Sequence, residues 1–254
     1  MAPTTNASNV IAASEHGRGW RLRVGLHSER GLREKNDDYG NWLDSEDVFA
    51  LADGIGGAPY GDVMARVAVN GALAGWHTGV GNAAAGRGDD RPSEALERTR
   101  VMFEHAEALV ADTKALLDEG GCGTTLVTAA RVADAFAVGS VGDTAAYRLR
   151  AGVLERLNPL GRAGVGTNAL ASALGGRQAA DPALWEDTLA DGDVFLLATD
   201  GIWAHTSENE IARVLADGAP NAPRMAHDLA VSVAWRDNAT ALVIVVEKAK
   251  GDDA

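Results

Sequence analysis

Short apolar runs separated by polar or glycine-rich turns dominate the hydrophobic pattern of the chain. Polar and apolar residues alternate from Arg21 to Ser28, which predicts a strand with one face buried. Continuous apolar runs, typical of strands buried on both faces, cover 48–52, 194–199 and 241–246. The other predicted strands are 124–132, 135–141, 145–150, 153–157 and 184–189. Because the gaps in the middle of the chain are short, we expect antiparallel meanders there, since parallel pairs need long crossovers.

Two pairs of helices are predicted between these strands. Apolar residues recur at helical spacing in 63–76, which Asp62 is placed to cap, and again in a segment from Pro92 to about Asp118. Two shorter helices are predicted at 207–215 and 224–233. Sheets packed face to face, with helices outside, would bury the apolar strands on both sides. The pattern therefore predicts an α+β fold, a central antiparallel β-sandwich flanked by helix pairs in four αββα layers.

The chain is expected to form one domain, residues 20–248. Residues 1–19 are small and polar and predict a flexible N-terminal tail, and residues 249–254 predict a short charged C-terminal tail. The stretch 79–91 is rich in glycine, alanine, aspartate and arginine, which predicts an exposed loop. One domain is favoured over two because acidic motifs that would form a single site are spread along almost the whole chain.

Composition and charge restrict the classes of function. The formal net charge of -13 argues against nucleic-acid binding, because phosphate contacts need a basic surface. No run approaches the roughly 20 apolar residues of a membrane helix, and the start of the chain lacks a secretory signal. Cys122 is the only cysteine, so no intrachain disulfide can form. We expect a cytoplasmic monomer without membrane contact.

Acidic residues stand where several apolar strands end. A carboxylate at the end of a buried strand is costly unless a cation or hydrogen bonds compensate it. Several of them in one kind of setting indicate a single site assembled by folding, and hard cations such as Mg²⁺ and Mn²⁺ prefer oxygen ligands. The motifs are Asn36-Asp37-Asp38, Asp53-Gly54, Asp200-Gly201 and Asp237-Asn238.

Each of these motifs also has an ordinary explanation. A lone Asp-Gly or Asp-Asn is usually a turn, and Arg33 taken alone would be a surface arginine. Their joint occurrence favours a two-metal site with Arg33 as a bidentate phosphate ligand. Cys122 lacks a phosphate-binding loop after it, the six histidines lack zinc spacing, and neither a nucleotide-binding loop nor a serine nucleophile elbow is present. A water activated by metal ions would make a side-chain nucleophile unnecessary.

Seven short motifs occur in an order that resembles the metal-dependent type 2C protein serine/threonine phosphatases, with the bacterial branch as the closer likeness. The resemblance spans about residues 21–247. The motifs are R-x-x-N-D-D (33–38), D-G-I-G-G (53–57), G-T-T (123–125), V-G-D-T (141–144), A-L-G (173–175), D-x-F-L-L-A-T-D-G-I-W (193–203) and D-N-A-T (237–240).

The resemblance implies the same layered sandwich and the hydrolysis of phosphoserine and phosphothreonine in proteins by a metal-activated water. It implies two Mn²⁺ or Mg²⁺ ions, with Asp53 bridging both. The Gly54 carbonyl would be a ligand of the second ion, and Asp200 and Asp237 would be ligands of the first. Arg33 would bind the substrate phosphate.

The chain departs from the family pattern at some of these positions. Asp37 stands where the family usually has a longer glutamate, and Asp38 follows as the second acid of that motif. Asp143 matches an aspartate that helps to hold a weaker third ion. Ile55 stands where many eukaryotic members have a histidine, and Ala145 stands where the family often has arginine.

The segment between Asn158 and Leu174 is shorter than the flap of bacterial relatives. We expect a reduced, glycine-rich flap at 161–167, an open cleft, and selectivity supplied by a partner or by co-localisation. The resemblance also implies phosphorylated protein substrates and a cognate bacterial serine/threonine kinase. Two alternatives stay open: a non-catalytic phosphatase-like regulatory or binding module, and a two-metal phosphodiesterase.

Overall fold

Two antiparallel sheets form the centre of the fold in the computed structural model, which describes residues 10–14, 19–55, 59–78, 93–117, 121–161, 170, 172–176, 179–218 and 221–249. The first sheet has the strand order β1 (Val10–Ser14), β2 (Trp20–Glu29), β11 (Ala239–Lys248), β10 (Val194–Ala198), β7 (Ala145–Arg150) and β8 (Val153–Arg156). The second has the order β3 (Asp38–Leu43), β4 (Val48–Asp53), β5 (Leu126–Val132), β6 (Ala135–Val141) and β9 (Ala183–Thr188). All neighbouring strands within each sheet run antiparallel.

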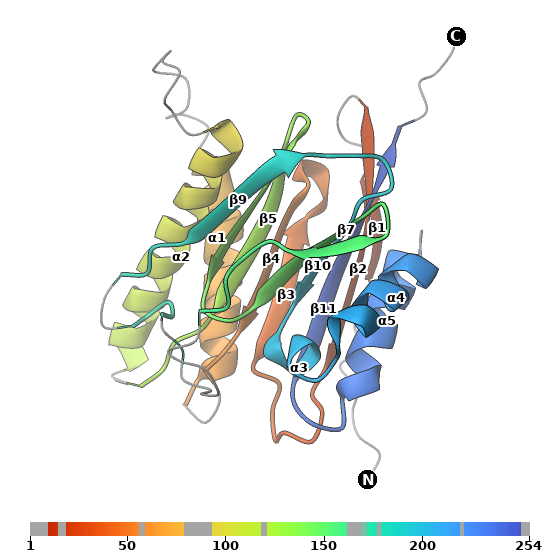
Figure 1. The fold of residues 1–254 in the computed structure, drawn as a ribbon. Helices are drawn as coiled ribbons and strands as arrows, with labels where there is room; N and C mark the ends of the chain where they lie inside the picture. Colours follow the sequence, from red (N-terminus) through yellow and green to blue (C-terminus); the bar gives the residue numbers. More distant parts are fainter. Residues whose placement is uncertain are drawn as a thin grey trace.

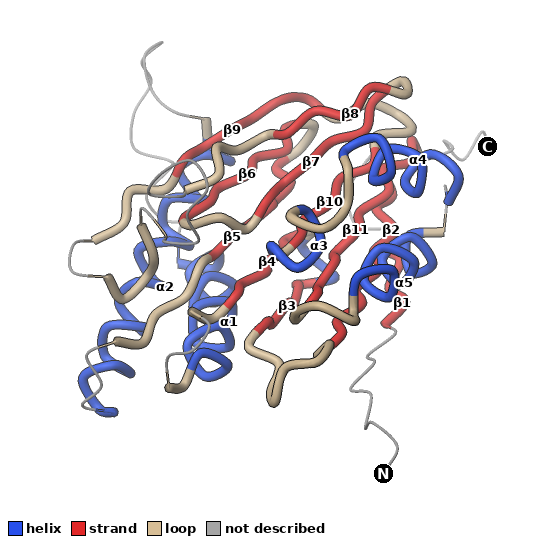
Figure 2. The backbone as a smooth tube through the Cα atoms, turned by 60° about the horizontal axis from the view of Figure 1, so that its bottom comes forward, coloured by secondary structure: helices blue, strands red, loops and turns tan. Residues whose placement is uncertain are grey.

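Helix pairs cover the outer faces of the sandwich (Figures 1 and 2). Helices α1 (Gly61–Thr78) and α2 (Glu94–Leu117) lie on the second sheet, and α4 (Glu208–Gly218) and α5 (Ala222–Val233) lie on the first. Two single turns complete the described elements: the 3-10 helix η1 (Asp44–Glu46) after β3 and helix α3 (Asp200–Trp203) after β10. The predicted four-layer αββα sandwich is thus confirmed.

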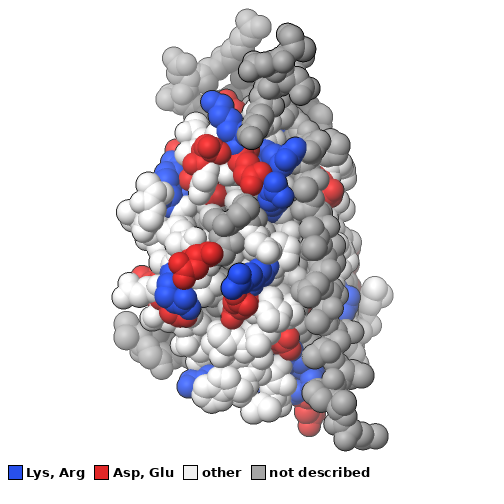
Figure 3. Space-filling model, turned by 90° about the vertical axis from the view of Figure 1, so that its right-hand side faces the viewer, with Lys and Arg blue, Asp and Glu red and all other residues white. Residues whose placement is uncertain are grey.

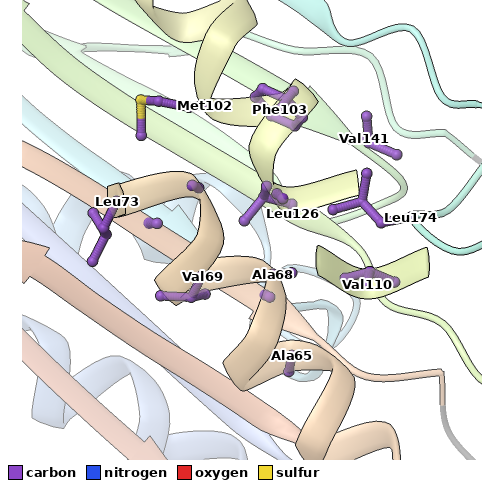
Figure 4. Packing of buried hydrophobic residues seen from close by; sticks show 14 of the residues in the cluster. Ala65, Ala68, Val69, Leu73, Met102, Phe103, Val110, Leu126, Val141 and Leu174 are labelled. Carbon is purple, nitrogen blue, oxygen red and sulfur yellow. The ribbon is translucent and has the colours of Figure 1, made fainter. Parts of the chain in front are cut away.

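Alternating side chains of β4 explain why its sequence is apolar without interruption. Val48, Ala50 and Ala52 face α1 and α2, where they join the cluster shown in Figure 4. Phe49 and Leu51 point the other way, into the core between the two sheets. Both faces of the strand are therefore buried, and a continuous apolar run is the sequence signature of that position.

The structure corrects the predicted connections between strands. Strands β6 and β7 follow each other closely but belong to different sheets, so the predicted meander is wrong at this point. The chain changes sheet through Gly142, whose φ is +90° and whose added Cβ would come within 2.6 Å of the Thr125 side chain. The next two strands also lie in different sheets: β9 pairs with β6 in the second sheet, and β10 pairs with β7 in the first.

Three elements differ from the sequence prediction. Strand β1 lies in the segment predicted as a flexible tail, so that prediction is wrong for Val10–Ser14, which pair with β2. Strand β3 was missed because its sequence, D-Y-G-N-W-L, has no clear alternation, and α3 was missed because it is a single turn. Most of the predicted flap (residues 162–169 and 171) lies outside the described residues. Within the described part of the chain, no helix is both long and apolar enough to cross a bilayer.

Candidate metal centre

The acidic motifs meet where one end of each sheet approaches the other, at the bottom of the view in Figure 1. Asp53 is the last residue of β4, and the β-sheet register pairs it with Asp38, the first residue of β3. Asp200 begins α3 directly after β10, and Asp237 lies just before β11, in the other sheet. Asp143 is buried in the turn between β6 and β7. The fold therefore brings together residues separated by up to two hundred positions in sequence.

Asp38 connects the two sheets through its carboxylate. Its Oδ2 atom accepts hydrogen bonds from Thr199 Oγ1 (2.8 Å) and Thr240 Oγ1 (2.7 Å), both on the opposite sheet. The Oδ1 atom is buried and has no hydrogen-bond partner. Burial, with the charges of Asp200 and Asp237, raises the pKa of Asp38 to about 7 although the threonine hydrogen bonds lower it. A cation is the obvious missing partner for such an oxygen.

Asp53 stands at the centre of the negative charge. Part of the residue is exposed, yet burial among the strand ends is the largest contribution that holds the pKa of its carboxyl well above the usual value. The charges of Asp38, Asp200, Asp143 and Asp237 follow as further causes. The charges of these four carboxylates all act on Asp53, so the five side chains share a single electrostatic site.

The backbone of Asp53 is fixed by two threonines, and a third supports one of them. Its N–H donates to Thr125 Oγ1 (2.9 Å), and its carbonyl accepts from Thr124 Oγ1 (2.8 Å) and from Thr125 N–H (2.9 Å). Thr144 hydrogen-bonds the Thr125 hydroxyl from the β6–β7 turn. The backbone that carries the central carboxylate is thus held by the residues directly before β5. This explains the position of the G-T-T motif (123–125).

Two glycines allow the backbone to approach closely around the carboxylates. A Cβ added to Gly54 would lie 2.2 Å from the Gly61 carbonyl oxygen, at the start of α1. A Cβ added to Gly201 would lie 1.8 Å from the Asn238 carbonyl oxygen. Neither contact leaves room for a side chain. The glycine of each Asp-Gly pair is therefore required by the close packing of the backbone.

Asp37 and Arg33 lie at the edge of the site and are already paired. Lys35 Nζ is 3.0 Å from both Asp37 Oδ1 and Asp62 Oδ1, so a lysine bridges these two carboxylates. Arg33 Nη2 is 2.6 Å from Asp237 Oδ2, and its side chain is about half exposed. Of the two acids in the Asn36-Asp37-Asp38 motif, Asp38 is the one directed at the central carboxylates.

Asn238 was not predicted as a site residue although it organises the edge of the site. Its Oδ1 accepts from Asp37 N–H (2.9 Å), and its Nδ2 donates to the carbonyls of Arg30 (2.7 Å) and Lys35 (3.0 Å). Asn238 therefore fastens the β2–β3 loop to the start of β11. The available signal was its place in the D-N-A-T motif at the start of an apolar strand, where Thr240 also stands.

The donor set fits hard divalent cations. All its side-chain donors are carboxylate oxygens, the chemistry that Mg²⁺ and Mn²⁺ prefer, and one of them is buried without a partner. Within the described ranges, no three His, Cys, Asp or Glu side chains are already gathered closely enough to hold an ion. Asp38, Asp53, Asp200 and Asp237, with the Gly54 carbonyl, are the residues that would hold the cations.

In the metal-free protein, Asp38→Asn should raise the melting temperature at pH 8. The carboxyl has a pKa of about 7 when folded and a usual value of 3.8, so the folded state binds more protons between these two pH values. Stability of the metal-free protein therefore falls as pH rises through this window. Thermal melts in EDTA should show a gain of about 3–6 °C for the variant at pH 8, where 1 kcal/mol corresponds to about 2–4 °C.

Asp181→Asn is the matched control for this measurement, because its side chain is 91 % exposed. Its melting temperature should follow that of the wild type from pH 5 to pH 8. An Asp38→Asn protein that melts below the wild type at pH 8 in EDTA would contradict the predicted electrostatic strain.

Comparison with known proteins finds a matching family model and similar phosphatases. The family model described as protein phosphatase 2C matches residues 26–218. A serine/threonine phosphatase, stp, of Listeria monocytogenes is 28 % identical over 140 residues, covering 54 % of this chain and 53 % of the relative. The chain thus spans about half the length of the curated relatives it matches.

Solved structures extend the likeness to the whole fold. The catalytic domain of the serine/threonine protein phosphatase PstP, solved in complex with two manganese ions, is 26 % identical to this chain. The match covers 90 % of this chain and 99 % of the PstP chain, with a TM-score of 0.73. PppA of Pseudomonas aeruginosa, at 22 % identity, covers 93 % and 100 % with the same TM-score and shares the fold. With its converging carboxylates and the family match over most of its length, the chain belongs to the protein phosphatase 2C family.

Proposed function

We propose that the chain hydrolyses phosphoserine and phosphothreonine in proteins with the help of divalent metal ions. The observation that carries the proposal is the convergence of Asp38, Asp53, Asp200 and Asp237 at the meeting of the two sheets, where burial and neighbouring negative charge raise the pKa values of Asp38 and Asp53. Membership of the protein phosphatase 2C family supports it, as do the serine/threonine phosphatases among the similar proteins.

Each site residue has a proposed part in the reaction. Asp53 would bridge two Mn²⁺ or Mg²⁺ ions, with the Gly54 carbonyl on one ion and Asp200 and Asp237 on the other. Such a pair supplies a nucleophilic water at neutral pH and neutralises charge on the phosphate. Arg33 would leave its ion pair with Asp237 and bind two oxygens of the substrate phosphate. Asp38 would keep the hydrogen bonds of its Oδ2 atom to the opposite sheet and offer its buried Oδ1 atom to the cations.

The outer acids have weaker proposed roles. Asp37, with its shorter side chain, would act from the outer shell of the metal site, and its pairing with Lys35 keeps it oriented. Asp143 would help to hold a third, weaker ion. The further proposals are a cognate serine/threonine kinase, a cytoplasmic monomer, and an open cleft under a short flap.

Hydrolysis of a phosphoserine peptide tests the proposal. Purified protein should release inorganic phosphate with Mn²⁺ or Mg²⁺ and stop when EDTA is added. Bis-p-nitrophenyl phosphate, a diester, should be cleaved much more slowly than p-nitrophenyl phosphate. No metal-dependent release from either monoester would contradict the proposed function and favour a regulatory module, and faster cleavage of the diester would favour a phosphodiesterase.

A further inference from the structure

Large apolar side chains are exposed on the loops that border the carboxylates. Among the described residues, seven large hydrophobic side chains are exposed, and two of them, Leu32 (80 %) and Trp235 (59 %), flank site residues in sequence. Leu32 immediately precedes Arg33, and Trp235 lies two residues before Asp237. Exposed apolar side chains grouped beside a site indicate a surface that binds something.

Leu32 and Trp235, which we call the apolar rim, belong to segments that are in direct contact. Gly31 has a φ of +64°, and a Cβ there would come within 2.2 Å of the Asp237 carbonyl and 2.7 Å of the Ala234 carbonyl. The turn at Gly31 thus packs on the backbone before β11. Figure 1 shows the β2–β3 loop and the α5–β11 turn side by side at the same end of the sandwich.

Both segments are held rigidly enough to present a fixed surface. The Asn238 side chain ties the turn before β11 to the carbonyls of Arg30 and Lys35 in the β2–β3 loop. The ion pair between Arg33 and Asp237 links the same two segments. The Arg236 guanidinium lies 4.0 Å from the centre of the Trp235 ring and so limits the orientations of the indole.

The charge of the rim differs from that of the rest of the chain. The whole chain has 36 acidic and 23 basic residues, whereas on these two short segments the bases balance the acids: Arg30, Arg33, Lys35 and Arg236 stand beside Glu34, Asp37, Asp38 and Asp237. On the face that carries α4 and α5, acidic and basic side chains are interspersed (Figure 3), as in the pairs that Arg213 makes with Glu210 and Asp217. An edge at which cations offset the negative charge of the site, with exposed apolar side chains beside them, suits a ligand that is both anionic and partly apolar.

We propose that the apolar rim binds substrate residues beside the phosphorylated serine or threonine and selects peptides with a large aliphatic side chain there. The inference rests on the proposed function, because the phosphate must occupy the centre for the neighbouring residues to reach Leu32 and Trp235. The rim cations complement the phosphate and acidic flanks, and the rim side chains bury the aliphatic group. A flat, preformed indole loses little conformational entropy on binding, which makes Trp235 the main contact.

Two phosphoserine peptides that differ only at the flanking residues test the proposal. One carries leucine two positions before and after the phosphoserine, and the other carries alanine at both. The wild type should show a kcat/KM about five- to ten-fold higher for the leucine peptide, as expected for one aliphatic side chain partly removed from water. This ratio should fall towards one in Trp235→Ala and in Leu32→Ala, and stay near the wild-type value in Trp235→Phe.

Leu116→Ala is the matched control, since Leu116 is 86 % exposed and belongs to α2, outside the two segments of the rim. Metal-dependent hydrolysis of p-nitrophenyl phosphate, which has no flanking residues, reports separately on the proposed function and shows whether each variant still forms the metal site. Equal kcat/KM for both peptides in an active wild type would overturn the rim proposal alone. Sedimentation velocity completes the test: a wild-type dimer that Trp235→Ala dissociates would assign the rim to self-association and overturn the proposal.

Discussion

Asp53→Asn should abolish metal-dependent phosphate release, with a loss in kcat of at least about 10³-fold, or ~4 kcal/mol of transition-state stabilisation. The reason is the position of the residue. Asp53 ends β4 among four other carboxylates, and the charge of each of them raises the pKa of the Asp53 carboxyl. An amide keeps the shape of the side chain but has one oxygen and no charge, so it cannot bridge two cations. Phosphate release from a phosphoserine peptide in Mn²⁺ measures the effect.

The same variant distinguishes loss of metal binding from loss of fold. Burial and neighbouring negative charge disfavour the ionised Asp53 carboxyl in the metal-free protein, so its removal should not lower the melting temperature in EDTA. Asp181→Asn, with a 91 % exposed side chain, should retain full activity. If Asp53→Asn folds and keeps wild-type activity, the carboxylate is not a metal bridge.

Gly201→Ala should strongly destabilise the protein, by about 3 kcal/mol or more, which lowers the melting temperature by roughly 6–12 °C. The new Cβ would lie 1.8 Å from the Asn238 carbonyl oxygen and 2.9 Å from its carbonyl carbon. Both contacts are with backbone, which cannot rotate away as a side chain can. Separation of α3 from the turn before β11 would also displace Asp200 and Asp237, so metal affinity should fall together with stability.

Gly121→Ala is the control, because an added Cβ there meets no atom within 4 Å. Its unfolding free energy should remain within about 1 kcal/mol of the wild-type value. Thermal or urea unfolding of the two variants measures the difference. A Gly201→Ala protein as stable as Gly121→Ala would show that the close approach at this point is not required.

The hydrophobic pattern predicted most of the fold because the central strands are buried on both faces. β4, β10 and β11 are continuous apolar runs, and each contributes side chains both to the core between the sheets and to a core under helices. Strand β3 was missed because only its first residue, Asp38, is buried, so its sequence shows no regular apolar face. The change of sheet after β6 was missed because a short gap alone does not show whether a turn closes a hairpin or leaves the sheet.

The acidic motifs predicted which residues the fold brings together, but not how each one is held. Asp38, Asp53, Asp143, Asp200 and Asp237 share one electrostatic environment, as the motif order implied. Long-range hydrogen bonds leave no local pattern in sequence. The bonds from Thr199 and Thr240 to Asp38, and from Asn238 to the β2–β3 loop, cross between segments up to about two hundred residues apart.

The ion pairs between basic residues and the acids of the site were also not predicted from the sequence. Arg33 was predicted to bind phosphate, and in the structure its guanidinium pairs with Asp237. Lys35 carried no prediction, yet its ammonium lies between Asp37 and Asp62. Cations from the β2–β3 loop thus compensate part of the negative charge at the edge of the site, which lets so many carboxylates fold together.

Equilibrium dialysis against Mn²⁺ tests the central claim most directly, because it counts the ions that the carboxylates hold. The wild type should bind at least two Mn²⁺ ions per chain, and Asp53→Asn, confirmed as folded by its melting temperature, should lose at least one of them. A wild type that binds no Mn²⁺ would contradict the assignment of these aspartates as one metal centre, and so would an Asp53→Asn protein that binds as many ions as the wild type.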